Sequence, residues 1–211
     1  DGATVSTTEL NLLDGKAATN LALLGKQEGT DFTNSLLVGH ATSGTLSSAS
    51  DNTGVGVLAL DALTSGIQNT AVGTSSLGSN ANGSYNVAFG RGSLSSNTNG
   101  SQNAAFGWGT LNGASSNYNT AIGHATGSNA SMNGTYNTFL GHRAGDAHTS
   151  GDGNVIIGAN TEVASATGDR QLTIGGYDGT NTTTWITGDS SGNLTFGGTI
   201  TVGSATVTEA Q

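Results

Sequence analysis

A 17-residue repeat runs through the middle of this chain and constrains its fold more than any other feature. Residues 69–73, with the sequence NTAVG, recur as NVAFG at 86–90 and as NAAFG at 103–107. Glycines close nine such segments, at successive steps of 17, 17, 17, 17, 16, 18, 17 and 17 residues. They are Gly39, Gly56, Gly73, Gly90, Gly107, Gly123, Gly141, Gly158 and Gly175. Because the one short step is followed by one long step, the register is restored, which a chance pattern would not do.

The composition of each repeat predicts β-strands rather than helices. A repeat offers a five-residue apolar segment, a glycine turn, a short second segment and another turn, whereas a helical repeat needs longer amphipathic runs. We therefore predict an all-β fold, a parallel β-solenoid or β-roll of about nine 17-residue coils. Strands stacked about 4.8 Å apart would make a rod of roughly 40 Å. Asn82-Gly83 and Asn99-Gly100 suggest a second turn with positive φ.

Two apolar columns follow from the alternation of side chains along a strand. The position before the closing glycine is large and apolar, so we expect it to fill the coil interior as a core column. Its central members are Val72, Phe89, Phe106, Ile122, Leu140 and Ile157. The preceding position is mostly alanine, at Ala71, Ala88, Ala105 and Ala121. A strand apolar on both faces is buried on both faces, so we expect this alanine column to pack against identical chains.

A polar column lies at the start of each segment. It consists of Asn52, Asn69, Asn86, Asn103, Asn119, Asn137 and Asn154. Amide side chains at strand spacing can hydrogen-bond from coil to coil as a ladder. A polar stripe that binds a ligand is the alternative interpretation, but regular polar columns in repeat proteins are typically architectural.

The flanks of the repeat have a different texture, which divides the chain into three parts. Residues 1–30 are expected to form a connector, with a capped short helix over residues 7–15. Residues 31–175 form the solenoid. Residues 176–211 contain alternating segments at 185–187, 193–196 and 199–202, which predict a β-strand shaft module. Residues 205–211 resemble residues 3–9, so we expect the chain to be one module of a longer protein that leads to a next module.

Three motifs of the chain, and their order along it, resemble known fibre proteins. The Asn-Thr-Ala-Val/Ile-Gly segment resembles the head repeats of trimeric bacterial adhesins of the YadA type, and more closely the repeats of phage tail fibres. Residues 8–15, TELNLLDG, resemble a short module of marine phage and cyanophage fibres, and residues 185–202 resemble the strand module of fibre shafts. The resemblance implies a homotrimer, a shaft role and a left-handed coil.

Composition argues against several other functions. A net charge of −9 disfavours nucleic acid as a partner, and no apolar run is long enough for membrane insertion. No acidic residue lies between Asp61 and Asp146, and no nucleophile motif is present. We therefore expect no enzymatic activity and no cofactor. His124 and His142 follow closing glycines in adjacent coils, about 5 Å apart if stacked. They are weak metal candidates, and polar turn residues facing water are the favoured interpretation.

These observations favour a structural segment of a trimeric phage fibre. It would be a rigid spacer in the virion tail, outside the cell, that carries host recognition. Its partners would be two identical chains and other tail proteins, with any host receptor bound through another segment. The alternative is a head or stalk segment of a trimeric bacterial surface adhesin. An ice-binding solenoid would need unbroken threonine ranks, and Val87, Ala104 and Val155 interrupt them.

Overall fold

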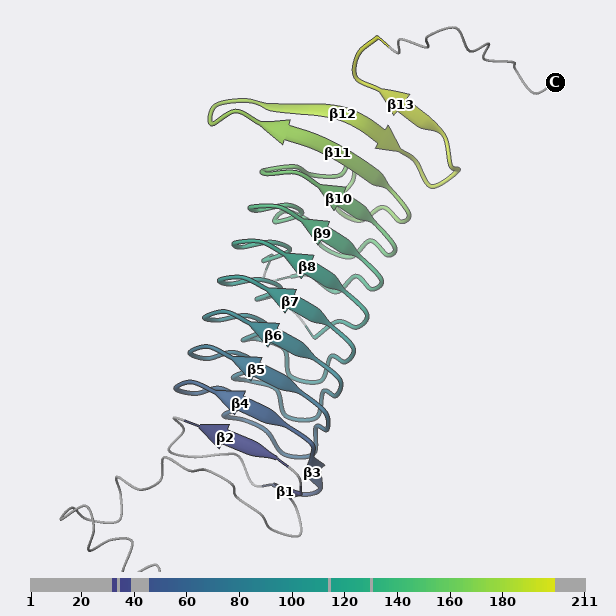
Figure 1. Ribbon diagram of the computed structural model, residues 1–211. Coiled ribbons are helices and arrows are strands. Elements are labelled where there is room, and N and C mark those ends of the chain that lie inside the picture. Colours follow the sequence, from purple (N-terminus) through teal and green to yellow (C-terminus); the bar gives the residue numbers. More distant parts are fainter. Residues whose placement is uncertain (1–31, 34, 39–45, 114, 130, 200–211) are drawn as a thin grey trace, which may run out of the picture.

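The computed structural model describes residues 32–33, 35–38, 46–113, 115–129 and 131–199. Within these residues the chain is all-β and forms a stack of coils, with one short strand per coil aligned along one side (Figure 1). The strands are β1 (Phe32–Thr33), β2 (Leu36–Val38), β3 (Ala49–Ser50), β4 (Thr53–Val55), β5 (Thr70–Val72), β6 (Val87–Phe89), β7 (Ala104–Phe106), β8 (Thr120–Ile122), β9 (Thr138–Leu140), β10 (Val155–Ile157), β11 (Leu172–Tyr177), β12 (Thr182–Gly188) and β13 (Leu194–Phe196). The predicted helix at 7–15 lies outside the described residues.

The larger sheet confirms the predicted parallel solenoid. It has eleven strands, of which β2 and β4 to β11 pair in parallel, so that nine strands define about eight turns. Equivalent residues pair throughout, for example Ala71 with Ala88. The register also survives the irregular steps, because Ala105 pairs with Ala121 and Ala121 pairs with Phe139. The 16- and 18-residue coils therefore place their length difference outside the strands.

The C-terminal end of the stack changes direction. Strand β12 pairs antiparallel with β11, and β13 pairs antiparallel with β12. Two of the strands predicted after Gly175 are therefore present, and they continue the same sheet as the coils. The third predicted strand, at 199–202, lies mostly outside the described residues.

The turn glycines that close the coils have positive φ, although the sequence predicted positive φ only for the second turn. The seven from Gly56 to Gly158 have φ between +125° and +139°, a region that only glycine occupies readily. The second glycine column is present in most coils, with Ser116 in its place in one, and its reason differs from the predicted one, since neither Gly83 nor Gly100 has a positive φ. A Cβ atom on Gly83 would lie 2.2 Å from the Gly100 carbonyl oxygen. Close approach of neighbouring coils therefore requires these glycines.

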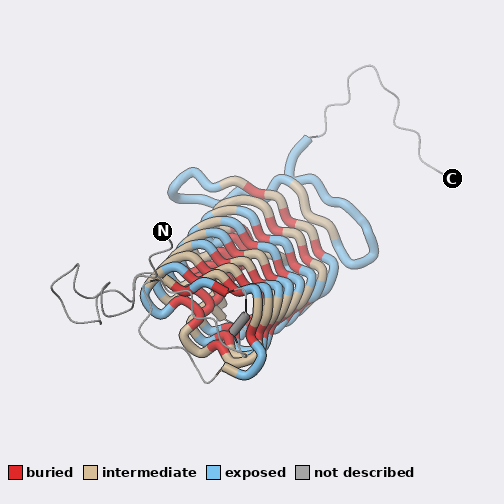
Figure 2. Tube along the Cα trace, turned by 60° about the horizontal axis from the view of Figure 1, so that its bottom comes forward, coloured by how far each residue is buried: buried red, intermediate tan, exposed pale blue. Residues whose placement is uncertain are grey.

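The coil interior is filled by small residues on the strands and larger residues on the segment opposite. Ala71, Ala88, Ala105 and Ala121 are fully buried, and they share one cluster with the leucine column Leu60, Leu77, Leu94 and Leu111. Figure 2 shows the buried positions repeating from coil to coil along the stack. The four leucines have φ between +49° and +57°. Such backbone costs about 1–3 kcal/mol, which burial of a leucine, about 1.5–3 kcal/mol, offsets.

Candidate interaction surface

The strands place their large apolar side chains outside the coil, so our assignment of the core column is wrong. Val55, Phe89, Phe106, Ile122 and Leu140 are 37–45% exposed, and Val72 and Ile157 are half-buried. The alanine column occupies the interior instead, so its predicted role as the contact between chains is wrong as well. The reason is the narrow cross-section of the coil. Leucines from the opposite segment leave room only for a methyl group on the strand side.

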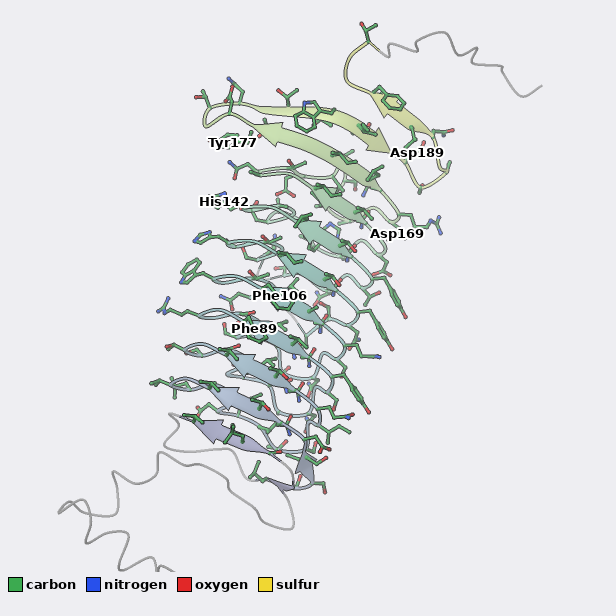
Figure 3. The ribbon with its side chains drawn as sticks, viewed as in Figure 1. Phe89, Phe106, His142, Asp169, Tyr177 and Asp189 are labelled. Carbon is green, nitrogen blue, oxygen red and sulfur yellow. The ribbon has the colours of Figure 1, made fainter. Side chains whose placement is uncertain are left out.

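Two outward-facing columns run the length of the sheet, and together they are called the outer strip here. One is the large apolar column from Val55 to Ile157. The other lies two residues earlier in each coil and holds Thr53, Thr70, Val87, Ala104, Thr120, Thr138 and Val155, which are all half-buried or exposed. Phe89 and Phe106 stack in this strip with ring centroids 5.4 Å apart (Figure 3). The large apolar column of the strip is therefore a continuous apolar stripe that the chain itself does not cover.

Two further columns flank the outer strip at the two ends of each strand. The first border precedes the asparagine column and contains Tyr85, Gln102, Tyr118 and Tyr136. The second border follows the turn glycines and contains Arg91, Trp108, His124 and His142. All eight side chains are exposed, and Figure 3 shows His142 projecting from the turn beyond the end of its strand.

The border side chains stack along the rod. Tyr118 and Tyr136 have ring centroids 4.6 Å apart, and Trp108 and His124 lie 4.7 Å apart. His124 and His142 lie 5.1 Å apart, which confirms the predicted spacing of about one coil. Their near-parallel rings, 18° between planes, form a stack rather than a chelating pair. Among the described residues, no group of three or more His, Cys, Asp or Glu gathers to hold a metal ion.

The surface formed by the strip and its borders carries little charge. Between residues 51 and 176 its four columns include only three residues with a formal charge, Asp51, Arg91 and Arg170. The chain as a whole has a net charge of −9, so the acidic residues are concentrated elsewhere. A surface of this kind does not repel a second copy of itself.

The asparagine column forms the predicted ladder on the inner side of the strip. Asn86 Nδ2 donates to Asn69 Oδ1 at 3.1 Å and to the Gly100 carbonyl at 2.8 Å. The Asn103 amide then donates to Asn86 Oδ1 at 3.0 Å. The whole column, Asn52, Asn69, Asn86, Asn103, Asn119, Asn137 and Asn154, is buried, and its groups are engaged with one another. These residues therefore hold coils together and are not presented to a ligand.

A titratable pair that sequence reasoning missed lies away from the strip, near the last coils. Glu162 occupies the position of the leucine column, where burial and a hydrogen bond with Asp146 raise its pKa to about 7. The Ala147 N–H donates to Glu162 Oε1 at 3.1 Å, and Arg143 Nε donates to Asp146 at 2.6 Å. The repeat itself contained the signal for this pair, because Glu162 occupies the position that Leu77 and Leu94 hold in earlier coils.

His148 is the second titratable group that the sequence did not single out. It is fully buried, its Nε2 lies 2.8 Å from the Gly151 carbonyl, and its ring contacts Phe139. Desolvation by burial lowers its pKa. Asn80 and Asn97 make the same bond, each through Nδ2, to the carbonyls of Gly83 and Gly100. His148 therefore replaces a structural asparagine.

Comparison with known proteins gives no match to a protein-family model, to a curated protein or to a solved structure. Within the part of the chain that is described, no helix has the length and apolar character needed to cross a membrane. The function must therefore be inferred from the surface itself and from the motifs of the sequence.

Proposed function

We propose that this chain is a rigid spacer segment of a homotrimeric fibre, in which three copies associate along their outer strips. The observation that carries the proposal is the unbroken apolar column from Val55 to Ile157, whose side chains are exposed or half-buried. Folding of the single chain does not explain these side chains, because the coil interior is already filled by the alanine and leucine columns. Another surface must cover them, and a second copy presents one of matching period.

The size of the strip fits a stable interface. Together with its two borders, the strip has nine rungs at about 4.8 Å and spans six residues of extended chain, which gives a surface of roughly 40 Å by 20 Å, or about 800 Å². This equals the area, about 800 Å², that each partner contributes to a typical specific interface.

The width of the strip favours three chains. Three flat surfaces about 20 Å wide, each a strip with its two borders, enclose a triangle whose sides lie about 6 Å from its axis. Sheets that pack face to face lie about 10 Å apart, so each contributes a side-chain layer of about 5 Å. One layer from each chain therefore fills the space around a threefold axis.

The assignment to a viral fibre rests on the sequence resemblance to phage tail fibres, with the bacterial adhesin as the alternative. Each coil hydrogen-bonds to the next, and a stack of this kind suits a rigid spacer whose role is structural rather than catalytic. In this proposal the segment belongs to the virion tail, other tail proteins continue the fibre, and host recognition resides in another segment.

Substitution in the outer strip tests the proposal. We expect the purified chain to have three times its mass of 20.7 kDa in light scattering or sedimentation. Phe106→Glu would place a carboxylate in the centre of the interface in all three chains, at a cost of several kcal/mol. The variant should therefore be monomeric and keep a β-type circular dichroism spectrum.

The matched control is Ser79→Glu, which adds the same charge at an exposed position off the strip. This variant should remain trimeric. A wild-type chain that is a folded monomer at micromolar concentration would overturn the proposal.

A further inference from the structure

Large side chains occupy the second border only in the four central coils, and there the first border is large as well. In the four central coils both borders carry large side chains: Tyr85 with Arg91, Gln102 with Trp108, Tyr118 with His124, and Tyr136 with His142. In the coils on either side the second border is small, with Gln68 opposite Thr74 and Gly153 opposite Ala159. Each pair belongs to one coil and lies at one level of the rod.

The two members of a pair do not meet within one chain. Six residues of extended backbone, about 20 Å, separate them, with the outer strip between. The observed ring contacts run along each border and not across the strip, as in Tyr118 with Tyr136 and His124 with His142. Contact within the chain therefore does not explain why both borders carry large side chains in the same four coils.

We infer that the first border of one chain packs against the second border of the next chain at the same level. This inference rests on the proposed trimer. A threefold axis parallel to the rod creates head-to-tail contacts without axial displacement, so residues of the same coil are brought together where two strips meet. The occupant of each border is thus a second copy of this chain.

The chemistry of the pairs is complementary. The Arg91 guanidinium fits the face of a tyrosine ring such as Tyr85. The Tyr118 and Tyr136 hydroxyls fit the ring nitrogens of His124 and His142, and the Gln102 amide oxygen fits the indole N–H of Trp108. Each pair combines at least one aromatic ring with at least one hydrogen-bonding or charged group.

The borders supply a register that the outer strip lacks. One column of the strip is large and apolar at every coil, so chains displaced by one coil, about 4.8 Å, would still bury apolar side chains against apolar side chains. The same displacement would set Tyr136 against Ala159 and Gln68 against Arg91. The borders thus select the aligned trimer over displaced ones, as polar positions select register in coiled coils.

Cysteine cross-linking tests the pairing, and the chain suits it because it contains no cysteine. The variant Tyr118→Cys/His124→Cys has both thiols at one level. The control Tyr118→Cys/Thr74→Cys has them three coils apart, about 14 Å along the rod. All three positions are exposed, so both variants should fold, and thermal melting verifies this.

With a short bis-maleimide, the same-level variant should yield covalent trimers on a denaturing gel. The displaced variant should stay mostly uncross-linked, and each single-cysteine variant should give no covalent trimer. If light scattering finds a trimer but the same-level variant does not cross-link, or the displaced variant cross-links equally well, the pairing is overturned and the proposed function stands. A monomer in light scattering overturns both, and covalent dimers alone would show a different symmetry.

Discussion

At the scale of single residues, a larger side chain on the strand side of the coil interior is accompanied by smaller residues on the opposite side. The strand position that holds alanine in four coils holds Phe139 in the next, and Phe139 is fully buried. The leucine column becomes Gly127 and Gly145 on its two sides, where a Cβ atom would lie 2.7 Å and 2.9 Å from the phenyl ring. The large residue is accommodated because two leucines are absent.

We predict a strong coupling between Phe139 and Gly127. Phe139→Ala should lower the free energy of unfolding by about 3–5 kcal/mol, because it leaves a cavity. Adding Gly127→Leu restores the alanine–leucine pattern of the preceding coils, and Leu111 tolerates the same backbone region, with φ of +49°. The double variant should therefore be more stable than Phe139→Ala in denaturant unfolding. Gly127→Leu alone should be destabilising through overpacking, and simple additivity of the two changes would contradict the exchange.

His148 should make stability depend on pH. Burial lowers its pKa below the usual 6.5, so the unfolded chain binds the proton more readily than the folded chain. The contribution of the neutral ring is present above pH 6.5 and is lost as the pH falls below that value. Melting temperatures measured between pH 7.5 and 5 should therefore drop more for the wild type than for His148→Asn, which keeps the bond to Gly151. An identical pH profile for the two proteins would rule out His148 as the cause.

At the scale of the strand and its ladder, the asparagines stabilise the stack through bonds to two neighbours at once. Asn86 donates to Asn69 and Gly100 and accepts from Asn103. Asn86→Ala would remove the acceptor of the buried Asn103 backbone N–H, and an unsatisfied buried group costs about 1–3 kcal/mol. We expect a loss of stability in denaturant unfolding that exceeds the loss for Asn99→Ala, a ladder residue on the exposed surface. Equal losses would show that the buried ladder contributes nothing special.

At the scale of the whole molecule, the rod has an internal core that is complete within one chain, and an outer strip that the chain itself leaves uncovered. Each coil contacts its neighbours and completes its own interior, so a monomeric Phe106→Glu variant should stay folded. Ala105→Arg, one residue away, would place a charge inside the coil and should unfold the chain. The antiparallel strands β12 and β13 end the parallel stack. Their side chains Trp185, Leu194 and Phe196 remain 44–56% exposed, so this end offers further apolar surface to the proposed trimer.

The sequence by itself determined the features that follow directly from its repeat, because equal residues at equal spacing occupy equivalent places in successive coils. The period, the parallel stack and the asparagine ladder were all predictable. Each depends only on equal spacing of equal residues and on the geometry of adjacent strands.

Only the tertiary structure decided which apolar column faces inward. Ala105 and Phe106 are both apolar, and alternation says that they face opposite ways but not which one is inside. The leucines of the opposite segment decide this, because they fill the coil and leave a methyl-sized space beside the strand. Close packing of neighbouring coils likewise explains Gly83, which avoids the carbonyl of the next coil. The filled interior leaves the large side chains of the strip on the surface, where they are available to other copies of the chain.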